Sequence, residues 1–446
     1  MAGQLLVRVY NVGLGDCIYL RVPDKNRDVH ILIDCGNKFG GTDLLGECIS
    51  HLKEELDETE TNKKRLDLLV VSHPHEDHHK GFEAEFFEDI RIGNLWLSPA
   101  YDRQNPNAKG FYALQNAARR ALTNLSAVAF GDLKEEVEEL LSLSKDEAID
   151  MLCNILPEAN GIQPRYVSTG TPPEQLQIFE DPTIKLSILG PMEDIDSYYF
   201  GGEGLQVTNR LNASAELSDG YDSILGDPGS VEVKLPRNIS TQDFKNLRSR
   251  VHMNALALAE IAGHAVNNLS VILLLEWHGR RLLFPGDAEW HETRNGEVKK
   301  GRANGSWNVM WQERRADLSR PLDFLKIGHH GSENATPWTS KKLRSGKVHP
   351  INQILDALLP LPQPGQLASA HAVASTKRTS RWPSIPNAEL MAELGRRIAN
   401  VRAEYVEPPS RKSVPANTPQ PQRTDLEAQL TDTPEKPVPY LEFFFS

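Results

Sequence analysis

The sequence predicts an α/β protein, and three observations support this class. Apolar segments typical of buried strands, at residues 5–11, 16–22, 29–34 and 67–72, flank a segment of helical character at residues 41–58. Several predicted strands end in His or Asp, and strand ends are where α/β sheets gather ligands. The chain has 446 residues, of which 39% are hydrophobic, and this content is ample for a packed core.

Two segments without strand patterns interrupt the later part of the chain, and further predicted strands lie between and after them. Residues 107–155 show helical periodicity, and residues 192–250 are rich in Gly, Asp and Asn with little periodicity. We therefore expect a helical insertion at about 104–160 and a loop insertion at about 192–263. Further strands are predicted at residues 184–191, 271–276, 281–284, 324–327 and 370–374, and a helix at residues 387–403.

The strand predicted at residues 66–72 leads into the sequence His-Pro-His-Glu-Asp-His at residues 73–78. In an extended segment His73 and His75 share one side, while Asp77 and His78 can turn toward a second position. Zinc, manganese and iron accept imidazole and carboxylate ligands, and none of the four Cys lies in this run. The spacing predicts a site for two metal ions, and the alternative is a solvated His-rich loop.

Three other predicted strands also end in polar side chains. One strand leads to Asp287, one to the pair His329 and His330, and one to Asp34. Asp34 stands beside a glycine and is a candidate for a carboxylate that orients a ligating His without touching the metal.

The ordered set of Asp34, the His-rich run, Gly286-Asp287 and the late His pair resembles the metallo-β-lactamase superfamily of hydrolases. More narrowly, Pro-Gly-Asp at 285–287 and Lys-Ile-Gly-His-His-Gly-Ser at 326–332 are similar to the ComEC-like competence branch. The opening Val-Tyr-Asn-Val-Gly-Leu-Gly-Asp at 9–16 is also similar, although that branch commonly has Asp and Gln in place of Asn11 and Leu14. The resemblance spans residues 5–332 and implies a four-layer αββα sandwich.

The resemblance also implies a ligand set for two divalent ions, zinc or manganese. His73 and His75 would hold the first ion, and Asp287 would bridge both ions. The second ion would be bound by Asp77, His78 and one of the pair His329 and His330, with His330 favoured and His329 left to contact a substrate phosphate.

The family usually supplies one more His to the first ion, before the bridging Asp. This chain has Asn267, Asn268 and Ser270 in that stretch, and His264 nearby has the wrong offset. The first ion is therefore expected to keep an open coordination position.

Two bound ions would supply a hydroxide near neutral pH and stabilise an oxyanion or phosphorane. Asp77 is expected to hold this hydroxide in line with the scissile centre. His329, Ser332 or Lys377 could contact the substrate or protonate the leaving group, with a surface lysine as the alternative for Lys377. Asn268 joins Asp34 and Ser332 as a residue that supports the ligands or contacts the substrate.

The expected organisation is a hydrolase domain at residues 1–405 followed by a Pro-rich tail at 406–446. The tail ends in the aromatic segment at residues 440–446. This segment is either a final strand docked on its own domain or a peptide that binds a protein partner, and the helical insertion is another candidate partner surface.

Composition bounds the location and the substrate. No window approaches the ~20 apolar residues that span a bilayer, and no leader is recognisable, so a cytoplasmic protein without a membrane channel is expected. Cys17 and Cys35 lie in strand contexts typical of buried free thiols. A net charge of −12 argues against a broad nucleic-acid-binding surface, yet Lys and Arg near the late ligands could form a local positive rim.

The favoured hypothesis is a dinuclear metal-dependent phosphodiesterase or nuclease. One alternative is a small-molecule hydrolase acting on an ester, lactone or thioester, because the same two ions serve acyl and phosphoryl centres. Another is an effector subunit, for example of an antiviral defence complex, whose hydrolysis is restrained until a partner binds.

Overall fold

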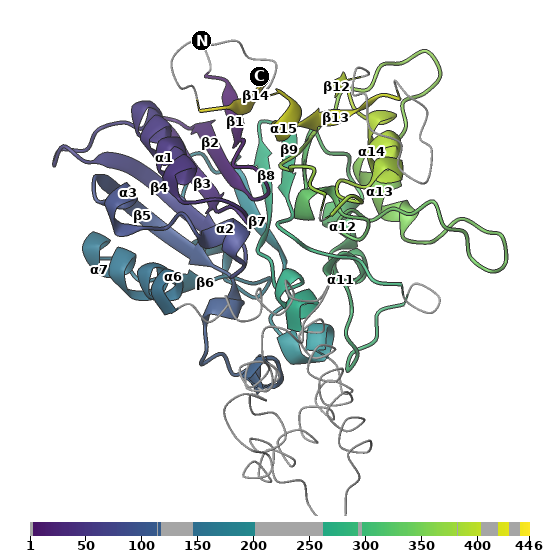
Figure 1. The fold of residues 1–446 in the computed structure, drawn as a ribbon, viewed down its shortest axis with the longest axis horizontal. Coiled ribbons are helices and arrows are strands. Elements are labelled where there is room, and N and C mark those ends of the chain that lie inside the picture. Colours follow the sequence, from purple (N-terminus) through teal and green to yellow (C-terminus); the bar gives the residue numbers. More distant parts are fainter. Residues whose placement is uncertain are drawn as a thin grey trace, which may run out of the picture.

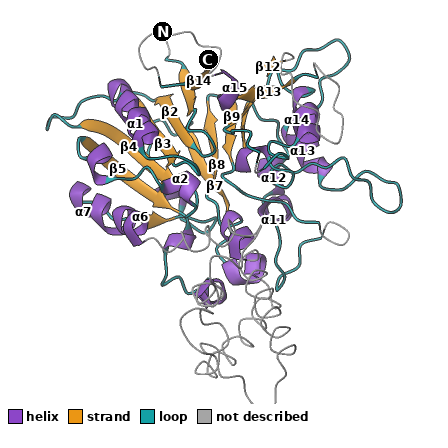
Figure 2. Cartoon of the chain, viewed as in Figure 1, coloured by secondary structure: helices purple, strands orange, loops and turns teal. Residues whose placement is uncertain are grey.

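Two β-sheets form the centre of the molecule in the computed structural model, with helices on both sides (Figures 1 and 2). The α/β class predicted from the sequence is confirmed. The structure describes residues 3–113, 115–116, 146–200, 262–292, 297–380, 382–402, 418–427 and 438–446.

The first sheet has seven strands in the order β14-β1-β2-β3-β4-β5-β6. Neighbouring strands are antiparallel from β14 to β3 and parallel from β3 to β6. Its strands are β1 (Leu5–Tyr10), β2 (Cys17–Pro23), β3 (Asp28–Cys35), β4 (Lys64–Val71), β5 (Ile90–Leu97), β6 (Arg165–Tyr166) and β14 (Tyr440–Phe445).

The second sheet also has seven strands, in the order β12-β13-β11-β10-β9-β8-β7. Strands β9, β10, β11 and β13 run parallel, and the outer pairs are antiparallel. Its strands are β7 (Lys185–Gly190), β8 (Ile272–Trp277), β9 (Arg280–Phe284), β10 (Phe324–Ile327), β11 (His371–Ala374), β12 (Val401–Arg402) and β13 (Gln420–Arg423).

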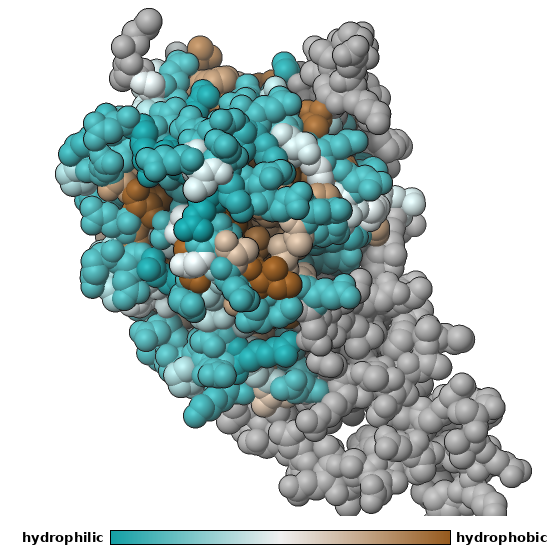
Figure 3. Space-filling view, turned by 90° about the vertical axis from the view of Figure 1, so that its left-hand side faces the viewer, coloured by the Kyte–Doolittle hydropathy of each residue, from teal (hydrophilic) through white to brown (hydrophobic). Residues whose placement is uncertain are grey.

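Helices cover the outer face of each sheet. In Figure 1, α1, α3, α6 and α7 lie beside the first sheet, and α11, α12, α13 and α14 lie beside the second. The surface formed on the side of the first sheet is mostly polar (Figure 3). The helices are α1 (Asp43–Glu55), α2 (Glu76–His79), α3 (Ala84–Phe87), α6 (Asp146–Asp150), α7 (Leu156–Asn160), α11 (Ser306–Glu313), α12 (Arg315–Leu318), α13 (Asn352–Leu358), α14 (Ala388–Gly395) and α15 (Thr424–Glu427).

Alternating apolar side chains explain this layered packing. In β1, Leu5 and Val7 belong to the core between the two sheets, while Leu6 belongs to the core under the helices. In β8, Leu273 lies in the same inner core, and Leu274 packs against the helices of the second sheet. These two strands thus bury both faces, and the molecule is an α/β sandwich.

Several elements differ from the sequence predictions. The helix predicted over residues 387–403 ends at Gly395, and β12 follows it. The terminal aromatic segment is a strand, β14, which pairs antiparallel with β1, so the docked-strand alternative is confirmed. Most of the two predicted insertions, residues 117–145 and 201–261, lies outside the described residues.

Two smaller predictions concern the thiols and the membrane. Cys17 and Cys35 are buried free thiols, as expected. Among the residues that the structure describes, no helix is both long and apolar enough to cross a membrane.

Candidate metal centre

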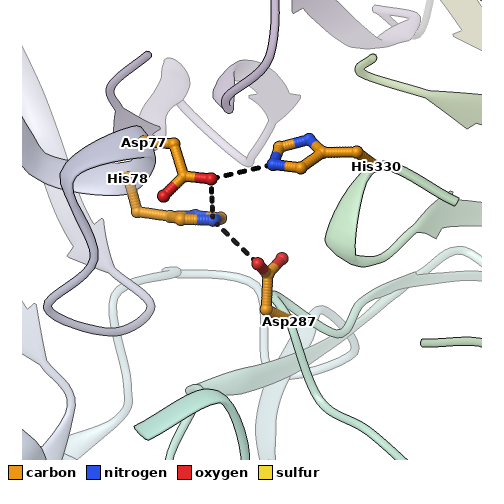
Figure 4. Close-up of side chains that lie close together, drawn as sticks. All are labelled: Asp77, His78, Asp287 and His330. Atoms are coloured by element: carbon orange, nitrogen blue, oxygen red, sulfur yellow. Dashed lines mark hydrogen bonds and ion pairs between the residues drawn. The ribbon is translucent and has the colours of Figure 1, made fainter. Parts of the chain in front are cut away.

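The predicted ligands lie at the carboxyl ends of strands from both sheets. Strand β4 ends at Val71, and the chain stays extended through His75, which precedes the short helix α2. Asp77 and His78 therefore lie in the helix and not in the extended segment, and their side chains point toward Asp287 and His330 (Figure 4). Asp287 follows β9 and His330 follows β10, and these two strands are parallel neighbours, so both residues emerge at the same edge.

Four of the predicted ligands form one buried cluster (Figure 4). Asp77, His78, Asp287 and His330 each offer a ligand atom, and these atoms lie within 4.8 Å of one another. His330 Nε2 is 2.8 Å from Asp77 Oδ2, and His78 Nε2 is 3.2 Å from Asp287 Oδ2. Asp77 Oδ1 is buried without a hydrogen-bond partner, which leaves this oxygen available as a metal ligand. This donor set fits a divalent cation.

His73 and His75 lie beside this cluster and are buried as well. His73 Nε2 is 2.9 Å from His75 Nδ1 and 3.8 Å from Asp287 Oδ2. Ser270, which follows Asn267 and Asn268, has its Oγ 3.3 Å from His73 Nδ1. The same hydroxyl accepts a hydrogen bond from the Asp287 backbone N–H at 3.1 Å.

Asp34 lies behind His78, on the side away from the other ligands. Asp34 Oδ2 is 2.8 Å from His78 Nδ1 and accepts a hydrogen bond from the Ser72 hydroxyl at 2.7 Å. Asp34 Oδ1 accepts a hydrogen bond from the Ser72 backbone N–H at 2.6 Å. The contact fixes the imidazole so that Nε2 faces Asp287. Asp34 has φ +59°, a left-handed conformation that non-glycine residues rarely adopt outside functional sites.

Gly36 keeps the backbone of α2 close to the end of β3. A Cβ at this position would lie 2.4 Å from the carbonyl carbon of Asp77. Only glycine fits there, and it allows the helix that carries Asp77 and His78 to approach Asp34.

Burial and charge set the protonation of the cluster. Burial disfavours the charged form of His78, but Asp287 and Asp34 outweigh it and raise its pKa well above the usual value. Burial alone would raise the pKa of Asp77, yet His330 and His78 hold it well below the usual range. Burial and the neighbouring His78 and His75 lower the pKa of His73, which favours the neutral imidazole, the form that binds a metal ion.

Of the other predicted site residues, His329 contacts the cluster, while Ser332, Lys377 and Asn268 have other surroundings. The His329 backbone N–H donates to Asp287 Oδ1 at 2.9 Å, and its partly exposed ring has Nε2 4.0 Å from Asp287 Oδ2. Ser332 donates to Asn334 Oδ1, and Lys377 is exposed on the loop after β11. Asn268 accepts hydrogen bonds from the backbone N–H groups of Ser306 and Glu289, so it supports the chain around the site.

Sequence reasoning missed several residues at the site. Ser72 links Asp34 to His73 and His78. Glu289 is fully buried between His291 and His264, the residue whose offset did not fit a ligand of the first ion. The alternation of Asp287, Glu289 and His291 along the chain was the available signal, because such spacing places side chains on one side of an extended segment.

No protein-family model matches the chain, and no curated protein matches it.

Proposed function

We propose that this chain is a dinuclear metal-dependent hydrolase of the metallo-β-lactamase type, close to the ComEC-like branch. One observation carries the proposal. Asp77, His78, Asp287 and His330 come from three separate segments, and their ligand atoms nevertheless lie within 4.8 Å in a buried position. His73 and His75 extend the donor set toward a second ion.

Asp77 and the neighbouring His329 have distinct tasks in this proposal. Bound divalent ions would lower the pKa of water far below its bulk value, to roughly 7, and supply the nucleophile. His330 and His78 hold the Asp77 carboxylate ionised, so Asp77 can orient that nucleophile. His329 is the partly exposed imidazole next to Asp287, and it is positioned to contact the substrate at the entrance.

A phosphodiester is the substrate that we favour. The resemblance of residues 285–287 and 326–332 to the competence branch supports it. Exposed basic side chains in the same half of the chain add attraction for an anion. They are Lys299, Lys300, Arg302, Arg315, Lys341, Lys342, Arg344 and Lys347.

The two alternatives have less support from the described residues. The pairing of β14 with β1 accounts for the terminal aromatic segment, which was one of the reasons to expect a protein partner. A lactone, ester or thioester substrate requires the same ions, so only a substrate comparison separates it from a phosphodiester.

Hydrolysis assays with manganese or zinc would test the proposal. Single- and double-stranded DNA, RNA, bis-p-nitrophenyl phosphate and a lactone serve as substrates. We expect phosphodiester cleavage, with kcat/KM about 10²–10⁴-fold lower in Asp77→Ala and His78→Ala. His51→Gln, a His of α1 remote from the cluster, is the control and should keep full activity. Cleavage confined to the lactone would overturn the substrate assignment, and no turnover of any substrate would overturn the hydrolase.

A further inference from the structure

A second group of potential metal ligands surrounds Glu289, two residues beyond Asp287. The Glu289 carboxylate is fully buried, and its Oε2 lies 2.8 Å from His264 Nδ1 and 3.3 Å from His291 Nε2. One ligand atom of each residue lies within 4.8 Å of the other two. This group shares no residue with the cluster of Asp77, His78, Asp287 and His330.

The two oxygens of Glu289 have different surroundings. Oε1 accepts a hydrogen bond from Asn267 Nδ2 at 3.0 Å, which fixes the carboxylate, whereas Oε2 faces the two imidazoles. A buried carboxylate is costly without a positive partner, and a bound cation between the two imidazoles would supply one.

The group is accessible from one side. The side chain of His264 is 46% exposed and that of His291 is 29% exposed, while Glu289 is completely buried. An ion could therefore enter between the imidazoles and keep open coordination positions toward solvent. Two His and one carboxylate with open positions form a donor set used for iron, manganese and zinc.

We propose that Glu289, His264 and His291 form a third metal site, which binds a divalent transition-metal ion independently of the dinuclear centre. This site lies beyond the proposed hydrolase function, because none of its residues is a ligand of the two catalytic ions.

His329 connects the two sites. Its Nδ1 is buried without a hydrogen-bond partner and lies 3.7 Å from Glu289 Oε1, and its Nε2 lies 4.0 Å from Asp287 Oδ2. The ring thus has one nitrogen toward each carboxylate. An ion at Glu289 would stand next to the dinuclear centre and add a positive charge where an anionic substrate would approach His329.

Metal counting in the full-length chain tests this proposal. Chelated protein is titrated with cobalt, followed by visible absorption, and the bound metal is then measured by elemental analysis after gel filtration. The double variant His264→Gln, His291→Gln should bind one ion fewer than the unaltered chain. Because both imidazoles are partly exposed, this variant is expected to fold, and thermal unfolding checks it.

Two further variants separate the third site from the catalytic centre. Asp77→Ala, His78→Ala should lose ions at the dinuclear centre and keep the absorption of the ion at Glu289, whether or not the protein hydrolyses any substrate. His51→Gln should bind as many ions as the unaltered chain. Equal metal content in the folded His264→Gln, His291→Gln variant and the unaltered chain would refute the third site and leave a hydrogen-bonded Glu-His group.

Discussion

Asp34 and Ser72 hold His78 from behind through contacts that are all shorter than 3.5 Å. Ligating imidazoles commonly have such a carboxylate partner, which fixes the tautomer and the orientation of the ring. The left-handed backbone of Asp34 costs free energy, and the hydrogen bonds of its carboxylate with His78 and Ser72 offset that cost.

Replacing this carboxylate tests the proposed metal centre without removing a proposed ligand. We expect Asp34→Asn to lower metal affinity about 10–100-fold, because the His78 ring loses its charged acceptor. Isothermal titration with zinc measures the change. Asp67→Asn, which alters another buried carboxylate of the same sheet, is the control and should bind zinc normally. Unchanged affinity in Asp34→Asn would contradict the orienting role.

Residue types and local spacing marked Asp77, His78, Asp287 and the pair of His329 and His330 as candidate ligands, and the family resemblance implied that they belong to one centre. The structure brings Asp77, His78, Asp287 and His330 together. The residues around Glu289 escaped prediction because His264 lies in a helical segment 25 positions before Glu289, and only the tertiary fold brings them together. Ser72 escaped because a serine has no metal-ligand signature in a sequence.

At the scale of elements, a buried ion pair joins the second sheet to the loop after β1. Lys326 of β10 donates from Nζ to Asp16 Oδ2 at 2.9 Å, and both side chains are 2% exposed. The Asp16 backbone N–H donates to the carbonyl oxygen of Asp77 at 3.0 Å. Strand β10 is thereby connected with the segment that carries the first two ligands of the cluster.

Removing one partner of this ion pair should lower the free energy of unfolding, whereas replacing both partners by apolar residues should have little effect. We expect Lys326→Met to lower the free energy of unfolding by about 3–5 kcal/mol, because Asp16 would remain buried and unpaired. Adding Asp16→Leu should restore most of the loss. Urea unfolding of the single and double variants measures the coupling, and strictly additive losses would contradict it.

Elements with strong apolar patterns were predicted well, and weakly patterned ones were not. Strands β1–β4 and β7–β11 lie within a few residues of their predicted positions. Strand β5 contains Arg91, Gly93 and Asn94, and β13 reads Gln-Pro-Gln-Arg, so neither has a strand-like pattern. These segments are strands because β5 pairs with β4 and β13 pairs with β11. A short stretch of sequence does not reveal such pairing.

At the scale of the whole molecule, the pairing of β14 with β1 closes one side of the sandwich. Phe443 and Phe445 belong to the core between the sheets, and the Phe443 ring centroid lies 5.2 Å from that of Phe324 in β10. The sequence left open whether this segment docks on its own domain or binds a partner, because the strand that it pairs with, β1, lies at the opposite end of the chain.

Two adjacent aromatic residues provide a matched test of this packing. Phe443→Ala should lower the free energy of unfolding by about 3–5 kcal/mol, because it empties a filled core position. Phe444, which is 51% exposed, should tolerate the same substitution within about 0.5 kcal/mol. Thermal and urea unfolding measure both. Equal effects of the two substitutions would show that β14 contributes little to the core.

The β1–β14 pair also has a consequence for synthesis of the protein. Arg8 of β1 bonds with Glu442 of β14, 434 positions later in the chain. At ~5–20 residues per second, a ribosome needs on the order of tens of seconds to produce the partner strand after β1. Throughout that interval the backbone of β1 has an open edge next to apolar side chains, so the nascent chain depends on chaperones or on rapid burial of that edge to avoid aggregation.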